Sequence, residues 1–598
     1  MKVIFCLLLV SALLFGCAPE AVIPFESQAP TQQAAEAVQP VSTQIDVSAQ
    51  FSDRDRSGSY DAGKCAVITL NGGSAVCSSD AVQIDGSTVT ITDEGTYLLR
   101  GTLEGGQILV NADKNDKTQL VLDGVTVTNQ TGAAVCILQA DKVFVTLAEG
   151  SQNSLSGGDS FEETENNVDA VLFSKEDLTL NGSGSLTVTS PAGHGIVSKD
   201  ALVVAGGSYT VTCASHGFAG KDSVAMTAAT VTVTSGKDGI HAENNDDGAL
   251  GYVYLENGSY LLTAQGDGIS AQSTLQIDDG SYTIETGGGS KNGTKQTSDH
   301  WGGFGGGGFG GRGEGGKRPG SRSTATTATE DSTSIKGIKA GASLVVNGGT
   351  YQIDSADDAL HCNGDLTLTA GTFQIATGDD GIHADEKLTL SGGTVNITES
   401  YEGLEGLHIA LQGGDVTLTA SDDGINAAGG TDQSGFGGRD QFGGGFGGRG
   451  PGGMSSGNGS IVISGGRLAV TASGDGIDAN GTLEITGGYT TVCGPTRGDT
   501  ATLDYDKTAT ISGGTFIGTG AMGMAQTFSD SKQGVLAVQV GNVAANTRVQ
   551  VADSQGKQLV DHTPALEYAV VIVSTPDIRK GESYNVTIGT TTSPVEAY

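Results

Sequence analysis

Basic residues and tryptophan are both scarce in this sequence. Its 598 residues include 31 Lys and Arg against 68 Asp and Glu, which gives a formal net charge of −37. A chain this acidic repels nucleic acid and attracts cations, so we expect no nucleic-acid partner. Trp301 is the only Trp and lies in a glycine-rich stretch. Any sugar binding would therefore depend on polar side chains and bound ions rather than on tryptophan platforms.

Cysteine is sparse as well, and its spacing does not suit a structural zinc site. None of the eight Cys residues forms a Cys-x-x-Cys pair, the usual feature of such sites. Cys65 and Cys77 are close enough in sequence for a local disulfide, and the sequence leaves that pairing open. Cys213, Cys362 and Cys493 stand where other repeats hold small residues, which predicts that they are core residues.

The amino end predicts export. An apolar run from Val3 to Phe15 follows Met1-Lys2, and it is too short for a membrane-spanning helix. Residues 1–16 are therefore predicted to be a signal peptide. Leu14-Phe15-Gly16-Cys17 resembles the lipobox of bacterial lipoproteins, which implies that Cys17 is lipidated and holds the protein at the extracellular face of the cell membrane. Residues 17–60, rich in Ala, Gln, Ser and Pro, are expected to be a flexible linker.

A short motif, an acidic residue followed by Gly and an apolar residue, recurs at a fixed period. Asp379-Asp380-Gly381-Ile382-His383 is its fullest form, and the apolar residue of the motif falls at 338, 360, 382, 404 and 425. An earlier series at 196, 218 and 240 has the same step of 22 residues. A constant period of this length indicates stacked units rather than a single globular core.

Within each repeat, apolar and polar residues alternate in runs of four to seven residues separated by glycine turns. This pattern predicts three short strands per repeat, and the short period excludes a propeller blade, which needs roughly 40–50 residues. We therefore predict an all-β fold, a parallel β-helix with coils of about 22 residues, over residues 61–534. Two glycine-rich inserts, 287–323 and 429–458, are expected to be disordered. Residues 535–598 change in character and are predicted to form a small β cap that covers the exposed strand edge.

Several stretches carry a recognisable family resemblance. Val89-Thr-Ile-Thr-Asp-Glu-Gly-Thr-Tyr-Leu-Leu-Arg-Gly, Leu120-Val-Leu-Asp-Gly-Val and Ser574-Thr-Pro-Asp-Ile-Arg-Lys-Gly-Glu-Ser-Tyr resemble bacterial carbohydrate-binding domain-containing surface lipoproteins. The resemblance covers nearly all of residues 60–598. It implies a right-handed parallel β-helix, similar to polysaccharide lyases of family nine, that binds calcium and plant cell-wall polysaccharide. It does not imply catalysis.

The repeated acidic residues are predicted to form a column along one face. Equivalent residues on adjacent coils of a β-helix lie about 4.8 Å apart, so carboxylates at this spacing repel one another unless a cation lies between them. Clusters of oxygen ligands suit calcium, although a single Asp before Gly is also explained by turn chemistry alone. Doubled Asp-Asp pairs favour the metal. The residues predicted to bind calcium are Asp357, Asp358, Asp379, Asp380, Glu402, Asp422 and Asp423.

Other side chains on the same face are predicted to contact the ligand, an acidic pectin-like polymer or cellulose. They are His361, His383, Asp385, Glu405 and Asn426. Two alternatives to non-catalytic binding stay open. A calcium-dependent pectate lyase would need a basic group near the metal, for which Lys339 is the candidate. A structural surface adhesin is the other alternative. We expect a monomer whose only link to the membrane is its lipid.

Overall fold

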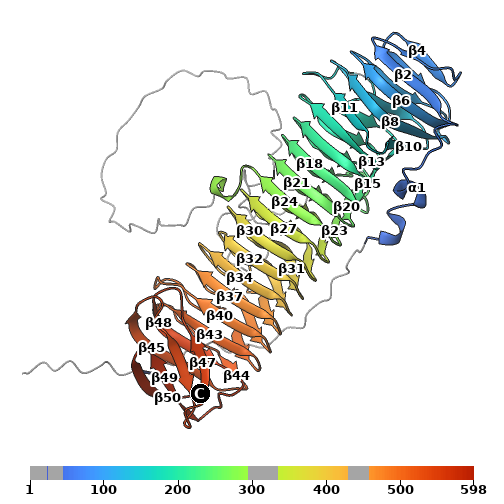
Figure 1. Cartoon of the computed structure of the whole chain (residues 1–598). Coiled ribbons are helices and arrows are strands. Elements are labelled where there is room, and N and C mark those ends of the chain that lie inside the picture. The colour runs from blue at the N-terminus through green and yellow to red at the C-terminus, as the bar shows by residue number, and fades with distance from the viewer. Residues whose placement is uncertain (1–22, 25–44, 164, 294–333, 429–456) are drawn as a thin grey trace, which may run out of the picture.

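The structure is a computed structural model that describes residues 23–24, 45–163, 165–293, 334–428 and 457–598 (Figure 1). Its main body is one long stack of short strands, most of them paired in parallel with the next coil. In Figure 1 the chain advances coil by coil from one end of the stack to the other. The predicted parallel β-helix is confirmed.

One coil shows how the 22-residue repeat builds the stack. It consists of β28 (Leu360–Cys362), β29 (Asp365–Leu368) and β30 (Thr372–Thr377). The first two pair in parallel with β31 (Ile382–Leu390) of the next coil, and β30 pairs with β32 (Thr394–Glu399). Leu360 lies opposite Ile382, and Phe373 lies opposite Val395. The repeat therefore fixes the register because each strand lies beside its counterpart 22 residues earlier.

Aliphatic and aromatic side chains fill the interior. Leu360 and Ile382 are fully buried, as alternation along their strands predicts. Tyr260, Tyr282, Tyr351 and Phe373 form a continuous interior stack with ring centroids 4.8, 4.8 and 4.4 Å apart. The tyrosine hydroxyls donate to backbone carbonyls three residues upstream, such as Tyr351 Oη to Gly348 O at 2.7 Å. These aromatics are core residues and are not available as sugar platforms.

Glycine is required where the chain turns into this aromatic stack. Gly349 has a φ of +98°, and a Cβ there would lie 2.9 Å from Tyr351 Oη. An L-residue with a side chain would be strained at this φ and would crowd the ring. The Gly-Gly pairs between repeats are therefore a structural requirement of the tight coil.

The C-terminal unit closes one end of the stack. Strand β48 (Tyr568–Ser574) pairs in antiparallel fashion with β43 (Thr515–Gly520) of the last coil and with β45 (Val535–Val543). A separate four-stranded antiparallel sheet follows the order β47 (Gln558–His562), β46 (Val549–Ala552), β49 (Ser583–Ile588) and β50 (Thr591–Glu596). The antiparallel pairing gives the strand edge of the last coil a hydrogen-bonded partner, which prevents its pairing with another chain.

The linker predicted for residues 17–60 is too long at its C-terminal end. Residues from 45 onward include a 3-10 helix, Val47–Ala49, and α1 (Asp53–Arg56). Asp55 is 3% exposed and bonds to Lys142 Nζ at 2.9 Å and Thr179 Oγ1 at 2.5 Å on the outside of the coils. Composition conceals this contact because it is made by scattered side chains, among them Phe51 against Tyr254 and Arg56 with Glu256, rather than by a periodic apolar run. Further upstream, β1 (Ile23–Pro24) pairs with β45.

The first glycine-rich insert begins later than predicted. Residues 287–293 form a turn and a 3-10 helix, Ser290–Asn292, whose first amide donates to Asp354 Oδ1 at 2.6 Å. These residues are held by Asp354, which the glycine content does not reveal. The rest of that insert, most of the second insert, the signal peptide 1–16 and Cys17 lie outside the described residues. Cys65 and Cys77 are free thiols in the structure. None of the described helices is long and apolar enough to cross a membrane.

Candidate functional site

A column of polar residues runs along one face of the β-helix, each two places before the buried apolar residue of its coil. We call this column the polar ladder. Its members are His194, His216, Asp238, Asp267, Lys336, Asp358, Asp380, Glu402, Asp423 and Asp475. The strands that follow them are β14 (His194–Ser198), which itself begins at the ladder residue, β16 (Phe218–Gly220), β19 (Ile240–Ala242), β22 (Ile269–Ala271), β25 (Ile338–Ala340), β28, β31, β33 (Leu404–Leu411), β35 (Ile425–Asn426) and β38 (Asp478–Ala479).

Aspartates of the polar ladder connect one coil to the next through the backbone. Asp358 Oδ1 accepts the backbone N–H of Asp380 at 3.1 Å, and Asp380 Oδ1 accepts that of Glu402 at 3.3 Å. Asp238, Asp267, Asp423 and Asp475 make the same bond to the next coil. One carboxylate oxygen of each ladder aspartate is therefore already engaged by a backbone N–H of the adjacent turn. The second oxygen of each carboxylate is the one that differs between coils.

In the middle of the ladder a lysine supplies positive charge. Lys336 is completely buried, and its Nζ lies 3.1 Å from Asp357 Oδ2 and 2.9 Å from Asp358 Oδ2. Although burial opposes ionisation of Asp358, Lys336 and His361 hold the pKa of its carboxyl well below the usual value. Asp357, Asp358 and Asp379 do bring carboxylate oxygens within 4.8 Å of one another. The ammonium group, however, already provides much of the charge that a calcium ion would bring.

The two histidines predicted to contact ligand are buried between coils. His361 and His383 are each 1% exposed and stack with ring centroids 4.8 Å apart. His361 Nδ1 lies 2.7 Å from Asp358 Oδ2, and burial and the nearby Lys336 lower the pKa of His361 to about 4. Neither ring is exposed for the predicted ligand contact, because each imidazole turns back to the aspartate three residues before it.

His383 is held by three carboxylates. Its Nδ1 lies 2.8 Å from Glu405 Oε2 and 3.3 Å from Asp380 Oδ2, and its Nε2 lies 3.0 Å from Asp385 Oδ1. Burial disfavours the imidazolium, but these carboxylates raise the pKa of His383 well above its ordinary value. Asp380, Asp385 and Glu405 therefore already have a cationic partner in the protonated ring.

The C-terminal end of the ladder, from Asp423 onward, is different in the part of the chain that the structure describes, because its carboxylates form no ion pair there with a basic side chain. Asp423, Asp475 and Asp478 place carboxylate oxygens within 4.8 Å of one another, and we call them the carboxylate triplet. No Lys, Arg or His side chain forms an ion pair with the triplet within the part of the chain that the structure describes. Burial, and then repulsion from neighbouring carboxylates inside and outside the triplet, raise the pKa of Asp423 to about 8, of Asp478 to about 7 and of Asp475 to about 6. A divalent cation would relieve this repulsion.

The other predicted residues lie close to these groups. Glu402 Oε1 accepts from Asn426 Nδ2 at 3.2 Å. Asp422 lies outside the carboxylate triplet but contributes to the raised pKa of Asp423. Lys339 pairs in register with His361, as the repeat predicts, and its Nζ donates to Ser334 Oγ at 3.0 Å. It is 4% exposed, so it is poorly placed to reach a polymer on the surface.

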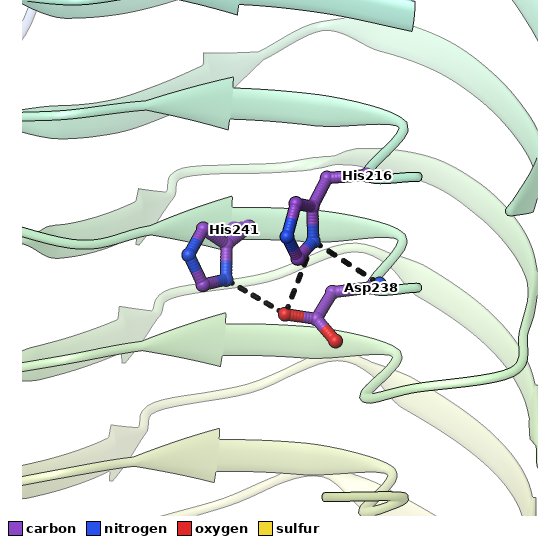
Figure 2. Close-up of side chains that lie close together, drawn as sticks. All are labelled: His216, Asp238 and His241. Atoms are coloured by element: carbon purple, nitrogen blue, oxygen red, sulfur yellow. Dashed lines mark hydrogen bonds and ion pairs between the residues drawn. The ribbon is translucent and has the colours of Figure 1, made fainter. Parts of the chain in front are cut away.

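Sequence reasoning missed two parts of the ladder. Asp475 and Asp478 are separated from Asp423 by the second insert, although the three lie on adjacent coils. At the other end, His216, Asp238 and His241 approach one another from successive coils, as Figure 2 shows. The signal was available in both cases: each ladder residue stands two places before a motif residue, Ile477 for Asp475 and Phe218 for His216.

This fold and this face define a parallel β-helix with a largely acidic polar ladder. The chain matches the family described as carbohydrate-binding domain-containing protein over residues 85–381 and 379–563. It belongs to that family.

Two individual proteins are similar to parts of the chain. A carbohydrate-binding domain-containing protein of Acetivibrio thermocellus is 37% identical over 135 residues, which is 22% of this chain and 47% of that protein. The chain thus matches about half the length of this relative. A solved structure, described as a polysaccharide lyase-like protein from C. thermocellum in a gadolinium derivative, is 32% identical and has a TM-score of 0.37. The match covers 38% of this chain and 92% of that one.

Proposed function

We propose that this protein binds an acidic, pectin-like polysaccharide along the polar ladder, and that calcium at the carboxylate triplet joins the polymer's carboxylates to the protein. Membership of the carbohydrate-binding family supports a polysaccharide ligand. The calcium part of the proposal is supported by the clustering of Asp423, Asp475 and Asp478 without a basic partner among the described residues.

The donor set of the triplet suits calcium. Three carboxylates supply oxygen ligands only, and calcium accepts 6–8 oxygens in flexible geometry. At least one carboxylate oxygen per aspartate remains after the backbone bonds to Asp475 N and Ala501 N. A uronate carboxylate could supply further oxygens. Of the residues predicted to bind calcium, this site keeps Asp423. It leaves out Asp357 and Asp358, whose carboxylates already contact Lys336 Nζ.

The shape of the ladder favours a linear polymer. Each coil presents the same face one strand spacing, about 4.8 Å, beyond the last. A chain of sugars lying along the axis therefore meets a repeated set of polar groups. The interior position of Tyr351 and the other stacked aromatics means that binding depends on ions and hydrogen bonds.

Binding without catalysis is the better supported form of this proposal. A lyase needs a base that reaches the proton next to the uronate carboxylate. Lys336 is paired with two buried aspartates, and Lys339 is 4% exposed. We also propose that lipid on Cys17 places this face outside the cell membrane. Nothing about the face favours an adhesin for protein partners.

A polysaccharide array with and without calcium tests the proposal. Polygalacturonate should be retained in calcium and released by a chelator, with weaker retention of neutral cellulose. No product absorbing in the near ultraviolet should accumulate. Accumulation of unsaturated product that disappears in Lys339→Ala would instead identify a lyase. If calcium changed the retention of none of the polymers tested, the proposal of a calcium-bridged site would be contradicted.

A further inference from the structure

The N-terminal end of the polar ladder contains two histidines in place of aspartates. His194 and His216 occupy ladder positions on successive coils, two coils and one coil before Asp238, respectively. They make the same bond to the next coil as the aspartates do. The backbone N–H of His216 donates to His194 Nδ1 at 3.3 Å, and that of Asp238 donates to His216 Nδ1 at 3.2 Å.

These backbone bonds determine where each imidazole carries its proton. A neutral imidazole has one acceptor nitrogen and one N–H. His216 Nδ1 also lies 3.3 Å from Asp238 Oδ2, but the backbone N–H bonds make Nδ1 an acceptor in both rings, which assigns the proton to Nε2. Burial lowers the pKa of His194 to about 3 and also lowers that of His216, so both rings stay neutral. Each then offers an Nε2–H donor.

Neither donor is used within the part of the chain that the structure describes. Asp169 Oδ2 lies 3.9 Å from His194 Nε2, which is beyond hydrogen-bond reach. No described acceptor lies within reach of His216 Nε2. In Figure 2 the Nδ1 atoms of His216 and His241 face Asp238, and their Nε2 atoms point away from it.

A transition-metal site is the obvious alternative, and the ring geometry opposes it. His216, Asp238 and His241 have ligand atoms within 4.8 Å of one another. The two rings, however, are stacked with centroids 4.2 Å apart and planes 19° apart. Lone pairs lie in the ring planes, so stacked rings direct them side by side rather than toward one ion. Asp238 Oδ2 instead pairs with His241 Nδ1 at 2.7 Å, and the pKa of His241 is raised to about 9 against the opposing effect of burial.

The two donors line a cavity of about 370 Å³. This volume falls in the usual range for small-ligand sites. Lys199 and Lys221 stand at the cavity wall, each 40–41% exposed at the side chain and paired with an aspartate. Glu243 and Asn245 supply acceptors on the same wall. Donors for a carboxylate and acceptors for hydroxyls are thus present together, as an acidic sugar requires.

We propose that this cavity is a second saccharide subsite, which binds the carboxylate of a uronate unit through the Nε2–H groups of His194 and His216 without a metal ion. The inference rests on the proposed function, since it takes the same class of polymer as ligand. It differs in mechanism: neutral imidazole donors and lysines bind the carboxylate directly, whereas the carboxylate triplet acts through calcium.

Calorimetry with digalacturonate in the presence of a chelator tests the subsite. The variants are His194→Asn and His216→Asn, singly and together. Asn Oδ1 is as many bonds from Cα as His Nδ1, so it can accept the same backbone N–H, as Asp238 Oδ1 does from Asp267 at 2.9 Å. Each variant therefore removes the Nε2 donor and keeps the bond to the next coil. The control is His408→Asn, which changes an exposed histidine outside the cavity.

The wild type should bind digalacturonate in chelator, and each histidine variant should bind about ten-fold more weakly. His408→Asn should bind as the wild type does. No binding by the wild type in chelator, or equal binding by the double variant, would overturn the subsite. A visible absorption band with cobalt that is lost in His216→Asn would overturn it in favour of a metal site. Calcium-dependent retention of polygalacturonate, measured separately, reports on the proposed function alone.

Discussion

Lys336 and Asp358 occupy the same ladder position on adjacent coils, and Lys336 Nζ lies 2.9 Å from Asp358 Oδ2 with both side chains fully buried. The ladder is therefore not uniformly acidic. A lysine interrupts the carboxylates in its middle, neutral histidines stand at one end, and an uncompensated group of carboxylates stands at the other. This arrangement assigns different chemistry to different coils of one repeated scaffold.

Removing the buried lysine should expose the charge that it neutralises. Lys336→Met leaves Asp357 and Asp358 without their ammonium partner, and breaking a buried pair in this way costs about 3–5 kcal/mol. We expect a lower thermal midpoint in chelator and a larger calcium-induced rise than in the wild type. Lys557→Met, which breaks an exposed pair with Asp577, is the control and should change little. Equal midpoints for Lys336→Met and the wild type would contradict the pairing.

The carboxylate triplet should make calcium binding depend on pH. Asp423 has a folded pKa of about 8 against an ordinary value of 3.8, so the folded state holds a proton that the unfolded state has released. In chelator this contribution to stability is complete below about pH 4 and is lost as the pH rises through about 8. Protons compete with calcium, so the calcium affinity should be weaker at about pH 6 than at about pH 8. Calorimetry at the two pH values checks this, and equal affinities would refute the raised pKa values.

The aromatic stack should contribute to stability through packing. Tyr351→Ala removes a fully buried ring between Tyr282 and Phe373, and such truncations cost about 3–5 kcal/mol. Tyr351→Phe keeps the ring and loses only the bond to Gly348, so it should cost about 1 kcal/mol. Denaturant unfolding of both variants separates the stability that comes from packing of the ring from the stability that comes from the hydroxyl's hydrogen bond. A Phe variant as unstable as the Ala variant would show that the hydroxyl matters more than the stack.

The lipid anchor stays a prediction from sequence. Labelled fatty acid should enter the wild-type protein in cells and be absent from Cys17→Ala, because the thiol is the acceptor. The control is Cys65→Ala, which leaves the lipobox intact. Equal labelling of wild type and Cys17→Ala would show that the protein is not a lipoprotein through this residue.

The fold was predictable because its period is short and constant. Motif residues such as Leu360 and Ile382 differ by one coil, and their pairing follows directly from that step. The same argument predicts which side chains share a column. It does not predict how a side chain turns within the column, and for that reason His361 and His383 are buried rather than outward-facing. Rotamers depend on local charge partners that the period does not encode.

Insertions hid the other parts of the site. Asp423 and Asp475 lie on adjacent coils but are separated in sequence by a glycine-rich insert, so the regular step fails between them. Residues 45–60 show the same difficulty in another form, because Phe51, Asp55 and Arg56 each contact the coils although the composition is that of a linker. Isolated contacts of this kind leave no periodic pattern in the sequence.

Calcium-dependent binding of polygalacturonate by a triplet variant tests the central claim most directly. The measurement is the affinity of the purified chain for polygalacturonate in calcium, for the wild type and for Asp423→Asn combined with Asp478→Asn. The matched control is Asp561→Asn, an exposed aspartate of the C-terminal sheet that pairs with Arg548. The account predicts that wild type and control bind alike, that the double variant loses calcium-dependent binding, and that a chelator brings all three to the same low affinity. Undiminished calcium-dependent binding by the double variant would contradict it.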